Sequence, residues 1–259
     1  MAEQLVLPDY AGMSDDELMK MSNAEFAQKI LEKAAMFGTD VMDRSKYRIE
    51  KLDDEERRQR LIQWNQKHAW LEWWLGVAPP SKQIVMLSED DMPIKILLAQ
   101  QIVDEVKHQR VFTKRVARLG GDPKLDRYRP DPVTRRTYDT TFGFDDPLDI
   151  AASLQCTGEA VLMHHVRPEH SITFATLDQE TLEDMARDVA PEEPRHVKNG
   201  EDLFKKYADT PERRRRIAQV QDLKLHALSD HYVADHRLVG AERIAPMPLI
   251  PRSPLLESA

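Results

Sequence analysis

The sequence predicts an all-α protein, built as a four-helix bundle with one long crossover and with extra helices at its N- and C-terminal ends. Apolar residues recur at steps of three and four over long stretches, which is the period of an amphipathic helix. No stretch alternates apolar and polar residues for long, as a half-buried strand would. Charged residues make up 32% of the chain, and only 9 of its 259 residues are glycine, a composition that also favours helix.

Residues 1–52 are predicted to form an N-terminal helical extension. The first 13 residues show no helical period, and we expect them to be loose. Ser14 and Ser22 are each followed by a glutamate three residues later, which is the pattern of a capping box at a helix start. The second of these helices is expected to run for about 15 residues and to end at Gly38.

Residues 53–240 are predicted to form the bundle, and residues 241–259, with four prolines, an extended tail. The first helix of the bundle is expected to end at Gly76 and Pro79-Pro80, because glycine and proline interrupt helices. Residues 122–146 have no strong period and are expected to form the long connection between two helix pairs. The helical periods cover residues 53–75, 91–119, 146–165, 178–208 and 210–240.

The charge and the cysteine content exclude several classes of function. Lys and Arg number 37 and Asp and Glu 45, a net charge of −8, so we expect no binding to nucleic acid or to an anionic membrane. The single cysteine, Cys156, rules out a disulfide framework and a cysteine-ligated iron–sulfur cluster. No apolar run reaches the ~18 residues of a membrane span, and the N-terminus lacks a signal-peptide pattern, so a cytoplasmic location is expected.

Two segments place a glutamate and a histidine three residues apart, Glu105 with His108 and Glu193 with His196. Residues three apart lie on one face of a helix. Both pairs interrupt a stripe of apolar residues that is expected to face the core. A charged carboxylate on such a stripe is costly unless it is paired or binds a metal. We therefore take both pairs as candidate metal ligands.

Each preceding helix supplies one further glutamate on a core-facing stripe. Glu72 precedes Glu105 by 33 residues, and Glu159 precedes Glu193 by 34. Near-equal spacings place each pair at the same height on two adjacent antiparallel helices. One glutamate from each of two helices and a Glu-x-x-His from each of the other two is the donor pattern of di-iron and di-manganese carboxylate proteins. The predicted metal ligands, through which catalysis would run, are Glu72, Glu105, His108, Glu159, Glu193 and His196.

Charge balance and neighbouring polar residues agree with a two-metal site. Two divalent metals carry +4 and four glutamates carry −4, and a neutral cluster is tolerated in a core better than bare carboxylates. Pro191 and Pro194 are expected to kink the helix around Glu193. Asp104 and Glu192, each just before a motif glutamate, could accept the second N–H of a ligand histidine. The other predicted hydrogen-bonding neighbours on the same stripes are His68, Gln101 and Gln155.

With these motifs the sequence resembles the ferritin-like di-iron oxygenases, and most closely the catalytic subunit of the phenylacetyl-CoA ring epoxidase and its relatives. The resemblance covers roughly residues 60–225. It rests on His68-Ala69 with Glu72, on Ile96-Leu97-Leu98-Ala99 leading to Asp104-Glu105 and His108, on Gly158 and Ala160 around Glu159, on Glu192-Glu193 with His196, and on Thr210-Pro211-Glu212.

The resemblance implies an oxidoreductase with two iron ions, a monooxygenase or hydroxylase that uses O2 to insert one oxygen atom into an organic substrate. An aromatic compound or an acyl thioester is the implied substrate class. The chain has no Gly-x-Gly-x-x-Gly fingerprint and no cysteine-ligated cluster, so electrons are expected from a separate reductase. A homo-oligomer or a complex with a sister subunit is also expected.

Other functions of such a site stay open. A ferroxidase or iron-handling protein would use the same ligands without an organic substrate, and a peroxide-consuming enzyme would use two manganese ions, because ligand type alone does not select the metal. Ribonucleotide reductase small subunits look similar at the cluster but have a radical tyrosine four residues after the first motif histidine. Here that position is Phe112, so a tyrosyl-radical role is not expected. The run Arg213–Arg216 is expected to be a solvated helix face, or else a docking point for an acidic redox partner or a substrate phosphate.

Overall fold

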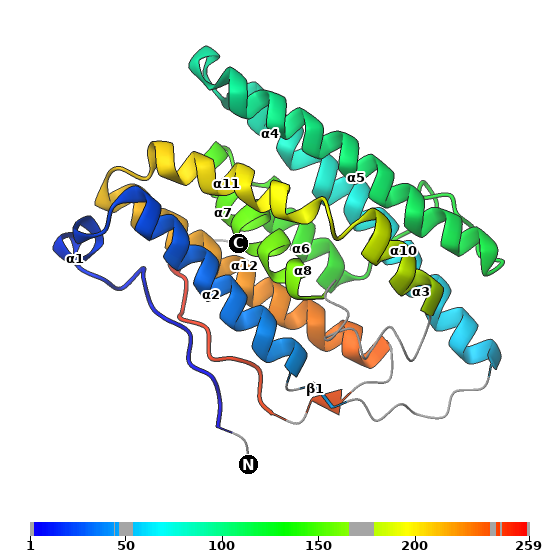
Figure 1. The fold of residues 1–259 in the computed structure, drawn as a ribbon. Helices are drawn as coiled ribbons and strands as arrows, with labels where there is room; N and C mark the ends of the chain where they lie inside the picture. The colour runs from blue at the N-terminus through cyan, green and yellow to red at the C-terminus, as the bar shows by residue number, and fades with distance from the viewer. Residues whose placement is uncertain are drawn as a thin grey trace.

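The computed structural model describes residues 3–43, 45–46, 54–165, 179–238, 242–243 and 245–257. These residues are mostly helical, which confirms the predicted all-α class (Figure 1). Among the described helices, none is long and apolar enough to cross a membrane. The domain boundaries predicted at residues 52 and 240 fall outside the described residues.

The N-terminal region contains two helices, α1 (Asp15–Lys20) and α2 (Asn23–Asp43). Ser14 caps α1 through a reciprocal pair of hydrogen bonds with Glu17, as the capping-box pattern predicts. The expected end of α2 at Gly38 is wrong. The helix continues because Phe37 and Val41 extend its buried apolar face, and one glycine inside a helix costs only about 1 kcal/mol.

The first long helix also continues past its predicted end. It consists of α3 (Asp54–Leu71), a π-helical segment (Glu72–Val77) that we call the first π segment, and α4 (Ala78–Met86). Pro79 and Pro80 lie in the first turn of α4, where a missing N–H is tolerated. After a 3-10 turn (Glu89–Asp91), α5 (Met92–Arg118) returns antiparallel to α3 and α4, close to the predicted bounds.

The connection between the helix pairs contains a helix that the sequence pattern does not predict, α6 (Pro132–Phe142). Asp131 caps it by accepting hydrogen bonds from the backbone N–H groups of Val133 and Thr134. The buried face of α6 consists largely of threonines, so no apolar period marks it.

The second helix pair is also interrupted. Its first member consists of α7 (Pro147–Ser153), a second π segment (Leu154–Glu159) and α8 (Ala160–His165). Its second member is broken into α10 (Gln179–Asp188) and α11 (Glu193–Tyr207), around the prolines that were predicted to kink it. The predicted ends of this pair between residues 166 and 178 lie outside the described residues.

The last helix, α12 (Pro211–Leu238), is followed by an extended tail with a short 3-10 turn (Pro254–Glu257). The N-terminal segment is not loose as expected. Its Leu7 N–H donates to the Leu249 carbonyl at 3.0 Å, because both segments are extended and leave backbone groups to pair. Two short strands, β1 (Ser45–Lys46) and β2 (Glu242–Arg243), pair antiparallel.

Helix packing brings the four motif-bearing segments together. The first π segment packs on α5, the second π segment packs on α11, and α11 also contacts α5. Helices α2 and α12 cover the second pair from the other side. The largest apolar core cluster lies among α1, α2, α5, α7, α11 and α12 and contains Phe26, Ile30, Leu98 and Leu203. The polar site lies beside this core, between the two helix pairs.

Candidate metal centre

The first π segment begins at Glu72, and its backbone lies close to α5. A Cβ atom built on Gly76 would lie 2.6 Å from Glu105 Oε2, so this position needs glycine for the carboxylate of Glu105 to lie where it does. The same reasoning applies on the second pair, where a Cβ on Gly200 would lie 2.7 Å from Cys156 Sγ. Close helix approach at both places allows short glutamate side chains to meet.

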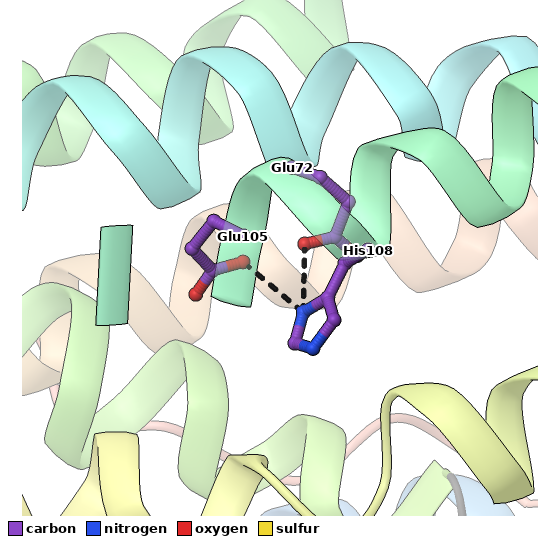
Figure 2. Close-up of side chains that lie close together, drawn as sticks. All are labelled: Glu72, Glu105 and His108. Carbon is purple, nitrogen blue, oxygen red and sulfur yellow. Dashed lines mark ion pairs between the residues drawn. The ribbon is translucent and has the colours of Figure 1, made fainter. Parts of the chain in front are cut away.

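The first group of side chains consists of Glu72, Glu105 and His108 (Figure 2). His108 Nδ1 lies 3.4 Å from Glu105 Oε2 and 3.8 Å from Glu72 Oε2. Figure 2 shows both carboxylates directed toward this nitrogen, from α5 and from the first π segment. Their ligand atoms all lie within 4.8 Å of one another.

The second group consists of Glu105, Glu159 and His196, which also lie within 4.8 Å of one another. His196 Nδ1 is 3.1 Å from Glu105 Oε1, so the two oxygens of Glu105 face different histidines. Glu193 behaves in the same way, with Oε1 3.5 Å from His108 Nδ1 and Oε2 3.6 Å from His196 Nδ1. The carboxylates of Glu105 and Glu193 therefore lie between the two histidines.

Several atoms of the cluster are buried without a hydrogen-bond partner among the described residues. They are Glu105 Oε1, both oxygens of Glu193, His108 Nδ1 and His196 Nδ1. Buried polar atoms without partners are rare and costly in proteins. Convergent carboxylate oxygens and imidazole nitrogens are ligands that divalent iron and manganese accept, so this donor set fits a two-metal centre.

Each histidine is held from behind by the acid of the other motif. His108 Nε2 lies 3.1 Å from Glu192 Oε2, and His196 Nε2 lies 3.3 Å from Asp104 Oδ2. An Nε2–H that donates to a carboxylate leaves Nδ1 as the acceptor that points into the cluster. Asp104 and Glu192 were predicted to accept the second N–H of a ligand histidine. The structure adds that each acid pairs with the histidine of the other motif.

Two basic side chains that the sequence pattern did not single out, Lys107 and Arg195, hold these acids. Lys107 Nζ donates to Asp104 Oδ1 at 2.8 Å and to Glu192 Oε1 at 3.0 Å. Arg195 donates to the other oxygen of Asp104. Lys107 and Arg195 each lie three residues after one of the acids, so their spacing on the helix face was a signal that could have found them.

The side chains of the cluster shift one another's pKa values, in addition to the effect of burial. Burial raises the pKa of Glu72 to about 8, and burial together with Glu193 and Glu105 raises the pKa of Glu159 well above its ordinary value. Burial alone would lower the pKa of each cluster histidine, but the surrounding carboxylates raise both to about 11. Metal binding in such a site competes with protons, and metal uptake would release them.

Two predicted neighbours, Gln101 and Gln155, belong to a buried layer of amides one turn from the cluster. Gln155 Nε2 donates to Gln83 Oε1 at 2.8 Å and lies 3.4 Å from Gln101 Oε1. Asn199 Nδ2 lies 3.3 Å from the same Gln101 oxygen. Gln83 and Asn199 were missed, although Asn199 lies three residues after His196 on the same helix face.

His68, the third predicted hydrogen-bonding neighbour, contacts Trp64 on its own helix. Its Nδ1 lies 2.9 Å from the Trp64 carbonyl oxygen, and its ring stacks on the Trp64 ring with centroids 3.6 Å apart. No hydrogen bond from His68 to a candidate ligand is found among the described residues. The aromatic stacking turns the imidazole toward Trp64 instead.

The four arginines at the start of α12 are not a free basic patch. Arg214 is 1% exposed and donates to the carbonyls of Ala208, at 2.7 Å, and of Met21, at 2.8 Å. Arg215 pairs with Asp15, and Arg216 Nη2 lies 2.7 Å from Asp149 Oδ2. The run therefore joins α12 to the neighbouring helix ends and to α7.

Comparisons with known proteins leave the family of the chain open. No family model matches the sequence. No curated protein matches it significantly, and no solved structure matches it significantly. The geometry and chemistry of the site therefore carry the functional proposal.

Proposed function

We propose that the chain is a ferritin-like di-iron oxygenase, which acts on an organic substrate with O2 and with electrons from a separate reductase. The observation that carries this proposal is the buried cluster of four glutamates and two histidines, in which Glu105 and Glu193 each face both histidines. Acidic side chains on a solvated helix face would point into water and would not converge in this way. The buried cluster atoms that have no hydrogen-bond partner fit metal ligation.

Two metals would divide the ligands evenly. One would be held by Glu72 and His108 and the other by Glu159 and His196, with Glu105 and Glu193 shared between them. Four carboxylates balance the +4 charge of two divalent ions, which lowers the cost of burying them. When bound in the reduced state, such a metal pair supplies electrons that activate O2 for transfer of one oxygen atom to a substrate.

The protein's own residues would prepare the site for this chemistry. Glu192 and Asp104 would orient the two imidazoles, and Lys107 and Arg195 would hold those acids in place. Burial excludes bulk water, since Glu105, Glu193 and both cluster histidines are at most 1% exposed. An aromatic or acyl-thioester substrate is proposed from the sequence resemblance alone.

A dimanganese, peroxide-consuming enzyme is the second candidate. The donor set favours it in one respect, because four of the six ligand side chains are carboxylates, and oxygen ligands suit manganese. A ferroxidase would use the same ligands without an organic substrate. The products formed from O2 or from peroxide distinguish the oxygenase, the dimanganese enzyme and the ferroxidase.

Metal content tests the site directly. Protein produced with iron is expected to bind about two irons per chain, as two-metal carboxylate sites of this pattern do. Glu105→Ala and His196→Ala should lose most of this metal while helix content by circular dichroism stays unchanged. Glu183→Ala, an exposed glutamate of α10, is the matched control and should retain full metal. Full metal loading in both site variants would falsify the metal centre.

Product analysis tests the reaction. The loaded protein is incubated with a reductant, O2 and a panel of aromatic acyl-CoA thioesters and free arenes, and products are identified by mass spectrometry. Substrate-dependent O2 uptake with an oxygenated product supports the oxygenase. Iron oxidation without any product supports the ferroxidase, and O2 release from peroxide with bound manganese supports the dimanganese enzyme.

A further inference from the structure

The outer face of α5 exposes apolar side chains in an ordered row. Met92 and Ile96 are each 53% exposed and Val103 is 58% exposed. Ala99 lies between them and is exposed as well. Steps of four, three and four residues place all of them on one side of the helix.

This row continues as a coiled-coil seam. The next position, Val106, is half-buried, and Arg110 follows at the same alternation of three and four residues. We call Met92, Ile96, Ala99, Val103 and Val106 the α5 seam. Single exposed apolar residues are ordinary, but a row at heptad spacing is what a second helix packs against.

The surface is hollowed beside the seam. A groove of about 550 Å³ is lined by Ile96, Ala99 and Val103 from α5 and by Glu192 and Arg195 at the start of α11. The small side chain of Ala99 at the middle of the row allows a partner helix to approach closely. A helix lying along α5 would fill this groove.

We propose that α5 packs antiparallel against α5 of a second copy of this chain. The charges along the helix are self-complementary, with exposed Glu89 and Asp90 just before its start and exposed Arg110 in its second half. An antiparallel pair related by a two-fold axis brings the acidic end of each copy beside the basic half of the other, whereas a parallel pair places like charges together. No ion pair of Glu89 or Arg110 is found among the described residues, so both can pair across the interface.

Pairing would also cover the back of the candidate metal centre. The groove is lined by Asp104 and Glu192, the acids that hold the two cluster histidines. A second copy seated there would exclude water from these acids. The pairing itself rests on the surface of α5 and not on the proposed oxygenase activity, so either one can fail without the other.

Sedimentation equilibrium of the full chain tests the proposal. The wild type is expected to be a dimer at about 10 µM, and Ile96→Glu should raise the dimer dissociation constant by about 100-fold, because the two-fold axis places two carboxylates in one apolar interface. Met19→Glu on α1, where Met19 is 44% exposed, is the matched control and should leave the constant unchanged. Circular dichroism checks that both variants remain folded.

A charge exchange tests the antiparallel geometry separately. Glu89→Arg and Arg110→Glu alone should each weaken the dimer by about 10-fold, and the double variant should return to within about 3-fold of the wild type. A double variant weaker than either single variant overturns the antiparallel arrangement. A wild-type chain that stays monomeric at about 100 µM, or an Ile96→Glu variant that dimerises as tightly as the wild type, overturns the proposal itself.

Discussion

Gly76 shows at the residue scale how closely the helices must approach for the carboxylates to meet. Any β-carbon at this position overlaps the Glu105 side chain, with contacts of 2.6 Å to Oε2 and 2.7 Å to Cδ. Gly158, in the second π segment, differs, because a β-carbon there meets its nearest atom at an ordinary 3.4 Å. The two glycines each lie near a candidate ligand, but only one of them is required by space.

Gly76→Ala is therefore expected to displace Glu105 and to weaken metal binding by at least about 10-fold, a loss comparable to that of losing a group that orients a ligand. Gly158→Ala, adjacent to Glu159, is the matched control and should bind metal as the wild type does. Metal titration followed by absorbance and by circular dichroism measures both effects. Equal metal affinity in the two variants would show that Glu105 is not held against Gly76.

Lys224 of α12 gives a second prediction at this scale, on pH. Its Nζ is buried and donates to the Thr137 carbonyl at 2.8 Å and to Thr141 Oγ1 at 2.9 Å. Burial lowers the pKa of this amine to about 7. Between that value and the ordinary lysine pKa of 10.5 the unfolded chain binds more protons than the folded one, so stability rises with pH across this window.

In Lys224→Met this contribution is absent. Relative to the variant, the wild type should therefore gain stability as the pH rises from about 7 to 9, by up to about 1 kcal/mol per pH unit. Urea unfolding at three pH values within that window measures the difference. Parallel pH profiles of the two proteins would mean that Lys224 stays protonated when buried.

At the scale of elements, the helix starts were predictable and several helix ends were not. Capping residues such as Ser14 act within one turn, so their effect can be read from the local sequence. The end predicted at Gly76 failed because packing of the first π segment on α5 outweighs the local preference of glycine and proline. Helix α6 was missed because Thr134, Thr137 and Thr141 fill its buried positions in place of apolar residues.

The contact between α2 and α12 contains a buried ion pair. Lys33 Nζ lies 2.5 Å from Asp222 Oδ1, and both side chains are fully buried. Burial lowers the pKa of Lys33 and raises that of Asp222 to about 6, so each charge depends on the other. Removing one partner of such a pair leaves an uncompensated charge in the core.

Lys33→Met alone is thus expected to destabilise the protein by about 3–5 kcal/mol. The double variant Lys33→Met/Asp222→Leu should unfold within about 1 kcal/mol of the wild type, because an apolar pair of similar size needs no compensating charge. Chemical denaturation of the three proteins at pH 7 gives these values. A double variant as unstable as the single one would mean that the ion pair itself holds α2 on α12.

For the molecule as a whole, the sequence was sufficient for the helical class and for the convergence of six side chains. Glu72 and Glu159 could be placed because equal spacings imply equal heights on paired helices. Contacts between the two helix pairs could not be placed in this way. Neither the crossing of Asp104 to His196 nor that of Glu192 to His108 follows from periodicity along one helix.

The crossing of the two acids makes the halves of the chain depend on each other. Residues 54–119 contain one complete Glu-x-x-His motif and residues 146–208 contain the other, yet the acid that fixes each histidine lies in the opposite half. A half expressed alone would keep its Glu-x-x-His motif but lose the carboxylate that faces Nε2 of its histidine. The orientation of both imidazoles therefore depends on the contact between α5 and α11.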